Sequence, residues 1–88
     1  MLPNTIHPGE FLRDILDERA ISQSRLARHI GIEAGVINLI CKGKRGISAA
    51  MAKKLARALG TDADLWVNLQ MSYDLSRAED PDFGKLRA

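Results

Sequence analysis

Three side chains in this 88-residue sequence could bind a metal ion or act as a nucleophile: His7, His29 and Cys41. Their spacing does not match a zinc site, which usually gathers four ligands in closely spaced pairs. Cys41 lies in an apolar stripe, where a cysteine is more often a small core residue than a nucleophile. His29 stands near the end of an expected helix, where its charge would be tolerated. We therefore expect no metal site and no cofactor.

Serine, histidine and aspartate are all present, but no motif arranges them for hydrolysis. The sequence contains neither a G-x-S-x-G nucleophile elbow nor a metalloprotease motif. The segment Gly43-Lys44-Arg45-Gly46 lacks the G-x-x-x-x-G-K-[ST] pattern of a nucleotide-binding loop, and it follows a helix instead of a strand. A glycine-rich turn with two cations suits the backbone of DNA better. The sequence therefore favours a binding protein over an enzyme.

The basic loop directly follows a pair of short helices, expected at about 23–30 and 34–42. Ser22 can cap the first helix, because its hydroxyl accepts a backbone N–H that has no partner. Gly31 ends the first helix and Gly43 the second, since glycine adopts a positive φ without strain. Two short helices joined by such a turn form a helix-turn-helix.

A pair this small buries little apolar surface, so other elements must support it. Helical periodicity predicts them at about 8–19, 49–59 and 63–76, which makes the fold all-α with five helices. Their inner faces are expected to be apolar: Phe11, Leu12, Ile15 and Leu16; Met51, Leu55, Ala58 and Leu59; and Leu65, Trp66, Leu69 and Tyr73. We expect one domain with its core at about 8–76, a loose arm at 1–6 and a loose tail at 79–88.

The expected helix at 63–76 is apolar on two sides. Val67, Met71 and Leu75 follow at i, i+4 and i+8, roughly opposite the side assigned to the core. A surface helix needs only one apolar face to join its own core. The second face predicts a two-fold interface in a homodimer.

Composition indicates where the protein acts in the cell, and the distribution of charge indicates what it binds. A single cysteine excludes a disulfide within the chain, and the sequence shows no signal peptide and no apolar run that could span a membrane, so we expect a cytoplasmic protein. Residues 19–57 contain nine lysines and arginines against Glu33 alone, a balance of +8, although the net charge of the chain is only +2. Residues 1–18 and 58–88 each carry −3. This polarity favours a polyanion, most simply double-stranded DNA.

If the second helix of the pair enters the major groove, two sets of residues face the DNA. The set at and after the helix start comprises Glu33, Ala34, Gly35, Val36, Asn38 and Leu39, and the set near the phosphates comprises Gln23, Ser24, Lys42, Lys44 and Arg45. Asn38 is the amide that can bond bidentately to adenine, so we expect an A·T-rich half-site. Glu33 can accept from cytosine, or serve mainly as a helix cap.

Several segments together carry a resemblance to a known family. They are His7-Pro8-Gly9-Glu10, the helix pair with Ala27, Gly31 and Ile37, the loop Gly43-Lys44-Arg45-Gly46-Ile47, and LARALGTDADLWVNLQMSYDL at 55–75. On these residues the sequence, over about 7–78, resembles the HigA-type antitoxins, a branch of the Cro/repressor-like (XRE) helix-turn-helix proteins. The resemblance implies a small all-α dimer that represses its own operon.

The resemblance also implies a cognate toxin, usually an mRNA-cleaving ribonuclease of the RelE-like fold, which the antitoxin neutralises. An alternative is a protein-interaction module that sequesters a toxin and reads DNA poorly or not at all. The few donors in Glu33-Ala34-Gly35-Val36 favour that alternative, whereas the central charge of +8 favours the repressor.

Overall fold

Five α-helices follow one another in the computed structural model, which describes residues 6–88. They are α1 (Pro8–Glu18), α2 (Gln23–Ile30), α3 (Ala34–Cys41), α4 (Ala49–Leu59) and α5 (Ala63–Arg77). No strand occurs in this part of the chain, and each predicted helix end lies within one residue of the observed one. The all-α prediction is therefore confirmed. Residues 1–5 of the expected arm lie outside the described residues.

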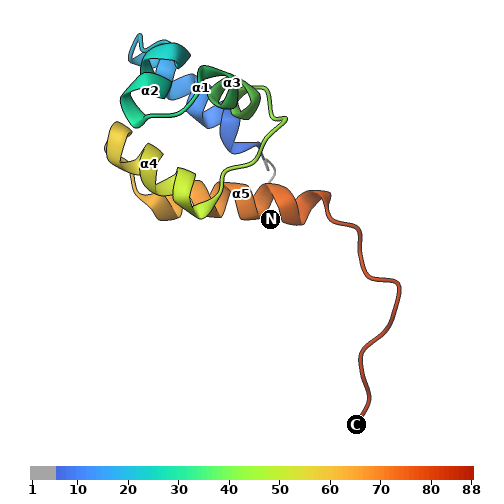
Figure 1. The fold of residues 1–88 in the computed structure, drawn as a ribbon. Helices are drawn as coiled ribbons and strands as arrows, with labels where there is room; N and C mark the ends of the chain where they lie inside the picture. The colour runs from blue at the N-terminus through green and yellow to red at the C-terminus, as the bar shows by residue number, and fades with distance from the viewer. Residues whose placement is uncertain (1–5) are drawn as a thin grey trace.

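Figure 1 shows α1, α2 and α3 packed together above α4, with α5 running along the base. The core lies between these groups, and its fully buried members are Leu12, Ile37, Ile40, Ala52, Leu55 and Trp66. The Trp66 ring lies 5.3 Å from the ring of Phe11, centroid to centroid, and its Nε1 donates to Thr61 Oγ1 at 2.8 Å. The indole N–H therefore has a partner although the ring is buried. Trp66 is a core residue, as predicted.

Side chains and backbone conformations mark the helix ends where the sequence predicted them. Ser22 Oγ accepts from Arg25 N at 3.0 Å and Ser48 Oγ accepts from Met51 N at 3.1 Å. Gly31 adopts φ +76° after α2, which lets the chain turn towards α3. Ala20, after α1, holds the same left-handed conformation at φ +56°, which costs a residue with a Cβ free energy.

Two predicted inner faces need correction. On α4 the buried stripe is Ala52, Leu55 and Leu59, spaced by three and four residues, while Met51 and Ala58 flank it and are only partly buried. On α5 the fully buried side chain is Trp66, with Ala63 and Val67 packed partly buried against the core, and Leu65 is 36% exposed because one residue turns the helix by about 100°. Helical periodicity found both helices but placed the centre of each apolar face one residue away.

Beyond Arg77 the chain forms no helix, and it leaves the helical body in Figure 1. Phe83 and Leu86 there are 83% and 94% exposed. In residues 6–88 no helix combines the length and the apolar composition needed to cross a membrane.

Candidate nucleic-acid interface

The helix-turn-helix is formed by α2 and α3. Ala27, on the inner side of α2, is 1% exposed, and Ile37 and Ile40 of α3 are fully buried in the same core. A larger side chain than alanine would separate the two helices. Because one face of α3 is buried in the core, the opposite face points outward, and the first residues of the helix, Ala34 and Gly35, are exposed to solvent.

The structure leaves most of the predicted DNA-contacting residues open. Exposed side chains or backbone occur at Ser24, Glu33, Ala34, Gly35, Leu39, Lys42, Lys44 and Arg45. Gln23 and Asn38 are half-buried. Val36, which was predicted to face outward, is also half-buried and packs against the core, and its contact with DNA stays a prediction.

Asn38 and Gln23 are joined by a hydrogen bond across the two helices. Asn38 Nδ2 donates to Gln23 Oε1 at 3.1 Å. With this orientation, Asn38 keeps its Oδ1 acceptor and one Nδ2 hydrogen, which are the two groups that adenine N6 and N7 require. The sequence predicted separate roles for the two residues, whereas the structure makes them one polar unit.

Glu33 stands at the N-cap position of α3, but its side chain makes no capping hydrogen bond. The interpretation of Glu33 mainly as a cap is therefore wrong. Glu33 is exposed, as are Ala34 and Gly35, which follow it, and its contact with DNA stays a prediction.

The basic loop after α3 is held by α5. Gln70 Oε1 accepts from Ile47 N at 2.7 Å, and Gln70 Nε2 donates to Asp74 Oδ1 at 2.8 Å. A Cβ at Gly46 would lie 3.1 Å from the Gln70 amide, so glycine permits this close approach. With Ile47 buried at 6% exposure, the loop is anchored at one end while Lys44 and Arg45 stay in solvent.

The sequence analysis missed the structural role of His7. Its Nδ1 accepts from Gly9 N at 2.9 Å and caps α1, while its ring packs against the Tyr73 ring in a T-shaped arrangement at a centroid distance of 4.8 Å. Burial lowers the pKa of His7, against the opposing charges of Asp74 and Glu10. His7 directly precedes Pro8, the first residue of α1, and this position is the sequence signal that could have revealed its capping role.

The structure also places the other two candidate residues, Cys41 and His29. Cys41 is a free thiol, 3% exposed, and its burial raises the pKa of the thiol, so it is the core residue predicted. His29 is exposed near the end of α2, as expected. In the described part of the chain, no three histidine, cysteine or acidic side chains gather closely enough to hold a metal ion.

Comparison with known proteins identifies the family. The helix-turn-helix family model matches residues 12–66. The structure is similar to that of the Pseudomonas aeruginosa antitoxin HigA with the higBA promoter, with a TM-score of 0.79, 46% identity and coverage of 83% of this chain and 80% of that one. The chain belongs to the HigA-type helix-turn-helix family. The resemblance drawn from residues 7–78 is confirmed.

Two further relatives extend this placement in the HigA-type family. A P. aeruginosa protein in complex with its operator DNA (28 bp) has a TM-score of 0.80 and 47% identity, covering 83% of this chain and 81% of that one. Virulence-associated protein I of Dichelobacter nodosus is 43% identical over 75 residues, which are 84% of this chain and 69% of the relative. The likeness thus includes α5 as well as the helix pair.

Proposed function

We propose that this HigA-type chain is a DNA-binding autorepressor and the antitoxin of a type II toxin–antitoxin pair. One observation carries the proposal: the α2–α3 pair and the anchored basic loop form one exposed surface, on a fold whose solved relatives include a protein bound to its operator. The protein would act in the cytoplasm, on the promoter of its own operon.

In this proposal α3 enters the major groove and α2 lies across the backbone. Asn38, held by Gln23, bonds to an adenine, while Lys42, Lys44 and Arg45 neutralise phosphates. Ala34, Gly35 and Leu39 offer no side-chain donor, so they contact thymine methyl groups or admit the DNA backbone. Ser24 hydrogen-bonds to a phosphate near the start of α2.

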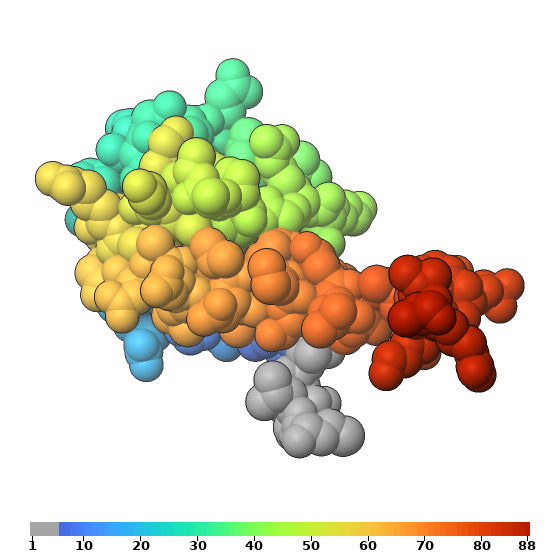
Figure 2. Space-filling view, turned by 90° about the horizontal axis from the view of Figure 1, so that it is seen from below, coloured from blue at the N-terminus to red at the C-terminus, as the bar shows by residue number. Residues whose placement is uncertain are grey.

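A homodimer would supply the second half-site. Met71 is 64% exposed and Leu75 is 75% exposed on the outer side of α5, which crosses the face seen in Figure 2. Val67 is partly buried and packs against the core of its own chain, so it contributes only an edge to this face. We expect Met71→Glu to give a folded monomer in analytical ultracentrifugation and to lose operator binding; an unchanged dimer would move the interface elsewhere.

Salt dependence tests the DNA interface. About three or four neutralised phosphates per subunit give a dimer a slope of log K against log salt of roughly −5 to −7, at about −0.9 per phosphate. Lys44→Ala should flatten the slope by about one per subunit and weaken all DNA sequences alike. Lys85→Ala, an equal loss of charge in the exposed tail, is the matched control and should change neither value. A wild-type slope near zero would contradict the proposal.

The toxin is proposed to be an mRNA-cleaving ribonuclease of the RelE-like fold, encoded beside this chain. A second candidate function, a toxin-sequestering module with little DNA reading, is favoured by one observation: the exposed start of α3 is Ala34-Gly35. Co-expression with the neighbouring reading frame tests the antitoxin role, since we expect growth arrest to be relieved and the two proteins to co-purify. Sequestration without any operator preference would establish the second candidate instead.

A further inference from the structure

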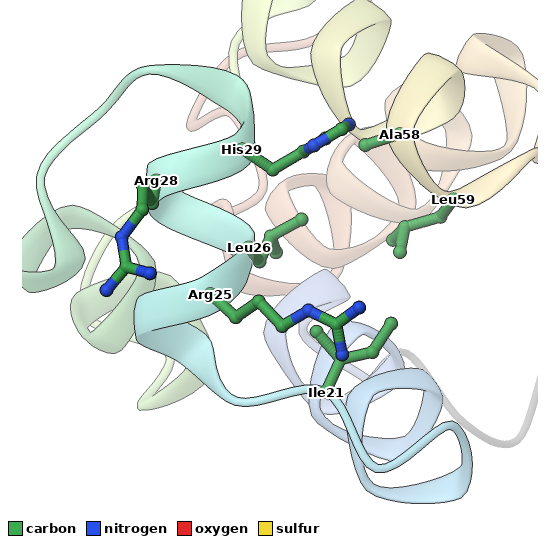
Figure 3. A pocket seen from close by; sticks show the side chains of 7 residues that line it. All are labelled: Ile21, Arg25, Leu26, Arg28, His29, Ala58 and Leu59. Atoms are coloured by element: carbon green, nitrogen blue, oxygen red, sulfur yellow. The ribbon is translucent and has the colours of Figure 1, made fainter.

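A pocket opens between α2 and the C-terminal end of α4, and its lining does not include the loop that carries Lys44 and Arg45. Figure 3 shows His29 reaching towards Ala58, with Leu26 between the two helices and Leu59 facing it. Arg25 points beneath them towards Ile21. The pocket has a volume of about 320 Å³, which is enough for a large apolar side chain. A second hollow of about 280 Å³ adjoins it and shares His29 and Ala58.

The apolar floor of this pocket is surrounded by cationic groups. The cations Arg25 and Arg28 line the first hollow, and Lys54 and Arg57 line the second, without an acidic residue among the lining side chains of either. Arg19 Nη1 donates to the Leu59 carbonyl oxygen at 2.8 Å, so the carbonyl end of α4 beside the pocket is also matched by a cation. Such a site selects an apolar side chain that is accompanied by carboxylates.

The tail of the chain has this chemistry. Glu79, Asp80 and Asp82 lie directly before Phe83, in the segment Glu79-Asp80-Pro81-Asp82-Phe83. Phe83 is 83% exposed. Burial of a phenylalanine side chain in an apolar pocket is favourable, and an exposed phenylalanine does not gain this free energy.

We propose that the pocket between α2 and α4 binds the C-terminal tail of a second copy of this chain. Phe83 occupies the apolar floor at Leu26 and Leu59. The carboxylates of Asp80 and Asp82 lie beside Arg25 and the cations of the adjoining hollow. The contact joins the acidic end of one copy to the basic centre of another.

The geometry favours a second copy over the chain's own tail. From Ala63 to Arg77, α5 extends roughly 21 Å at about 1.5 Å per residue. The pocket lies by Leu59, which precedes the start of α5, whereas the tail leaves at the other end. Six residue steps from Arg77 to Phe83 span at most roughly 22 Å. The tail of the same chain would have to be fully extended, reverse its direction and still pass over α4.

Binding of a peptide tests the site directly. A fluorescent peptide of residues 78–88 is titrated into the full chain carrying Phe83→Ala, whose own tail lacks the phenylalanine and so competes weakly, with anisotropy as the readout. We expect saturable binding that weakens with salt. Phe83→Ala in the peptide should weaken it about ten- to a hundredfold, as expected from the apolar area of a phenylalanine. Arg25→Glu in the protein should weaken it about three- to tenfold.

Two controls accompany the titration. Lys53→Glu reverses the charge of an exposed α4 residue that lines neither hollow, and it should leave binding within about twofold. Circular dichroism verifies that Arg25→Glu and Lys53→Glu remain folded. The absence of binding at millimolar protein, or an equal loss for the two charge reversals, would overturn the proposal.

A mixing experiment on the full chain identifies the donor of the tail. One sample carries a nitroxide on Leu86→Cys, since Cys41 is 3% exposed and does not compete for the label. It is mixed with an equal amount of isotope-labelled wild-type chain, whose amides are observed by NMR. We expect paramagnetic broadening at Arg25, His29 and Ala58. Broadening elsewhere or none at all would overturn the proposal, and because no readout uses DNA, either result leaves the DNA-binding proposal intact.

Discussion

Gln70 links the stability of the fold to the basic loop, so Gln70→Leu should affect both. The substitution keeps the side-chain size but removes the acceptor of Ile47 N, which is bonded at 2.7 Å and partly buried, and the donor to Asp74. A buried N–H without a partner costs about 1–3 kcal/mol, and the partial exposure of this one places it near the lower end. At about 4–8 °C per kcal/mol for a domain of this size, we expect the midpoint of thermal unfolding to fall by roughly 5–10 °C.

The effect of Gln70→Leu on DNA binding should be independent of sequence. A loop released from α5 presents Lys44 and Arg45 less well, so the salt slope should flatten by up to about two per subunit, at about 0.9 per phosphate. Fluorescence anisotropy with a random duplex over a range of salt concentrations measures this.

Asn68→Leu, which replaces an exposed amide on the same helix, is the matched control for Gln70→Leu and should leave the salt slope unchanged. If Gln70→Leu lowers the unfolding midpoint but leaves the slope at the wild-type value, the anchored loop does not contact phosphates. If the midpoint does not fall either, the hydrogen bond to Ile47 does not hold the loop.

Three further changes test the fold that supports the interface. Ala20→Gly should raise the free energy of unfolding by about 0.5–1 kcal/mol, because Ala20 has φ +56°; a lower urea midpoint would contradict this. Gly9→Ala should lower the free energy of unfolding by about 1–3 kcal/mol in the same assay, because the added Cβ would overlap the Ile40 carbonyl. Gly35→Ala is the control: a Cβ there meets open space, so the free energy of unfolding should not fall. Burial holds the pKa of His7 below 6.5, so the unfolded chain takes up the proton first and stability falls as the pH drops through that value. His7→Asn keeps a capping side chain and should reduce this fall between about pH 7 and pH 5; an unchanged pH profile of the urea midpoint would refute the role of His7.

The helices could be predicted from the sequence because their signals are local. Ser22 and Ser48 cap the helices that they precede, and Gly31 ends α2, each through contacts with residues three to five positions away. The five helices follow from these signals together with apolar periodicity. The centre of the buried stripe on α4 could not be predicted in this way. Ala52 is buried by neighbouring helices, and the apolar periodicity of α4 does not determine where those helices lie.

The polar contacts of the site could not be predicted in the same way. The bonds from Asn38 to Gln23 and from Ile47 to Gln70 join residues that are 15 and 23 positions apart. Whether such amides meet depends on how α2, α3 and α5 cross, which the sequence pattern alone does not determine. His7 was missed for a related reason: its cap is local, but its burial depends on contact with Tyr73 from the far end of the chain.

The central claim is that α3 reads a DNA sequence in the promoter of the chain's own operon. The most direct measurement titrates wild type and Asn38→Ala against a duplex from that promoter and against a shuffled duplex of the same composition, at one fixed salt concentration. We expect wild type to prefer the promoter, and Asn38→Ala to lose about 1–3 kcal/mol on the promoter and much less on the shuffled duplex. Equal binding of wild type to both duplexes, or an equal loss on both for Asn38→Ala, would contradict the claim.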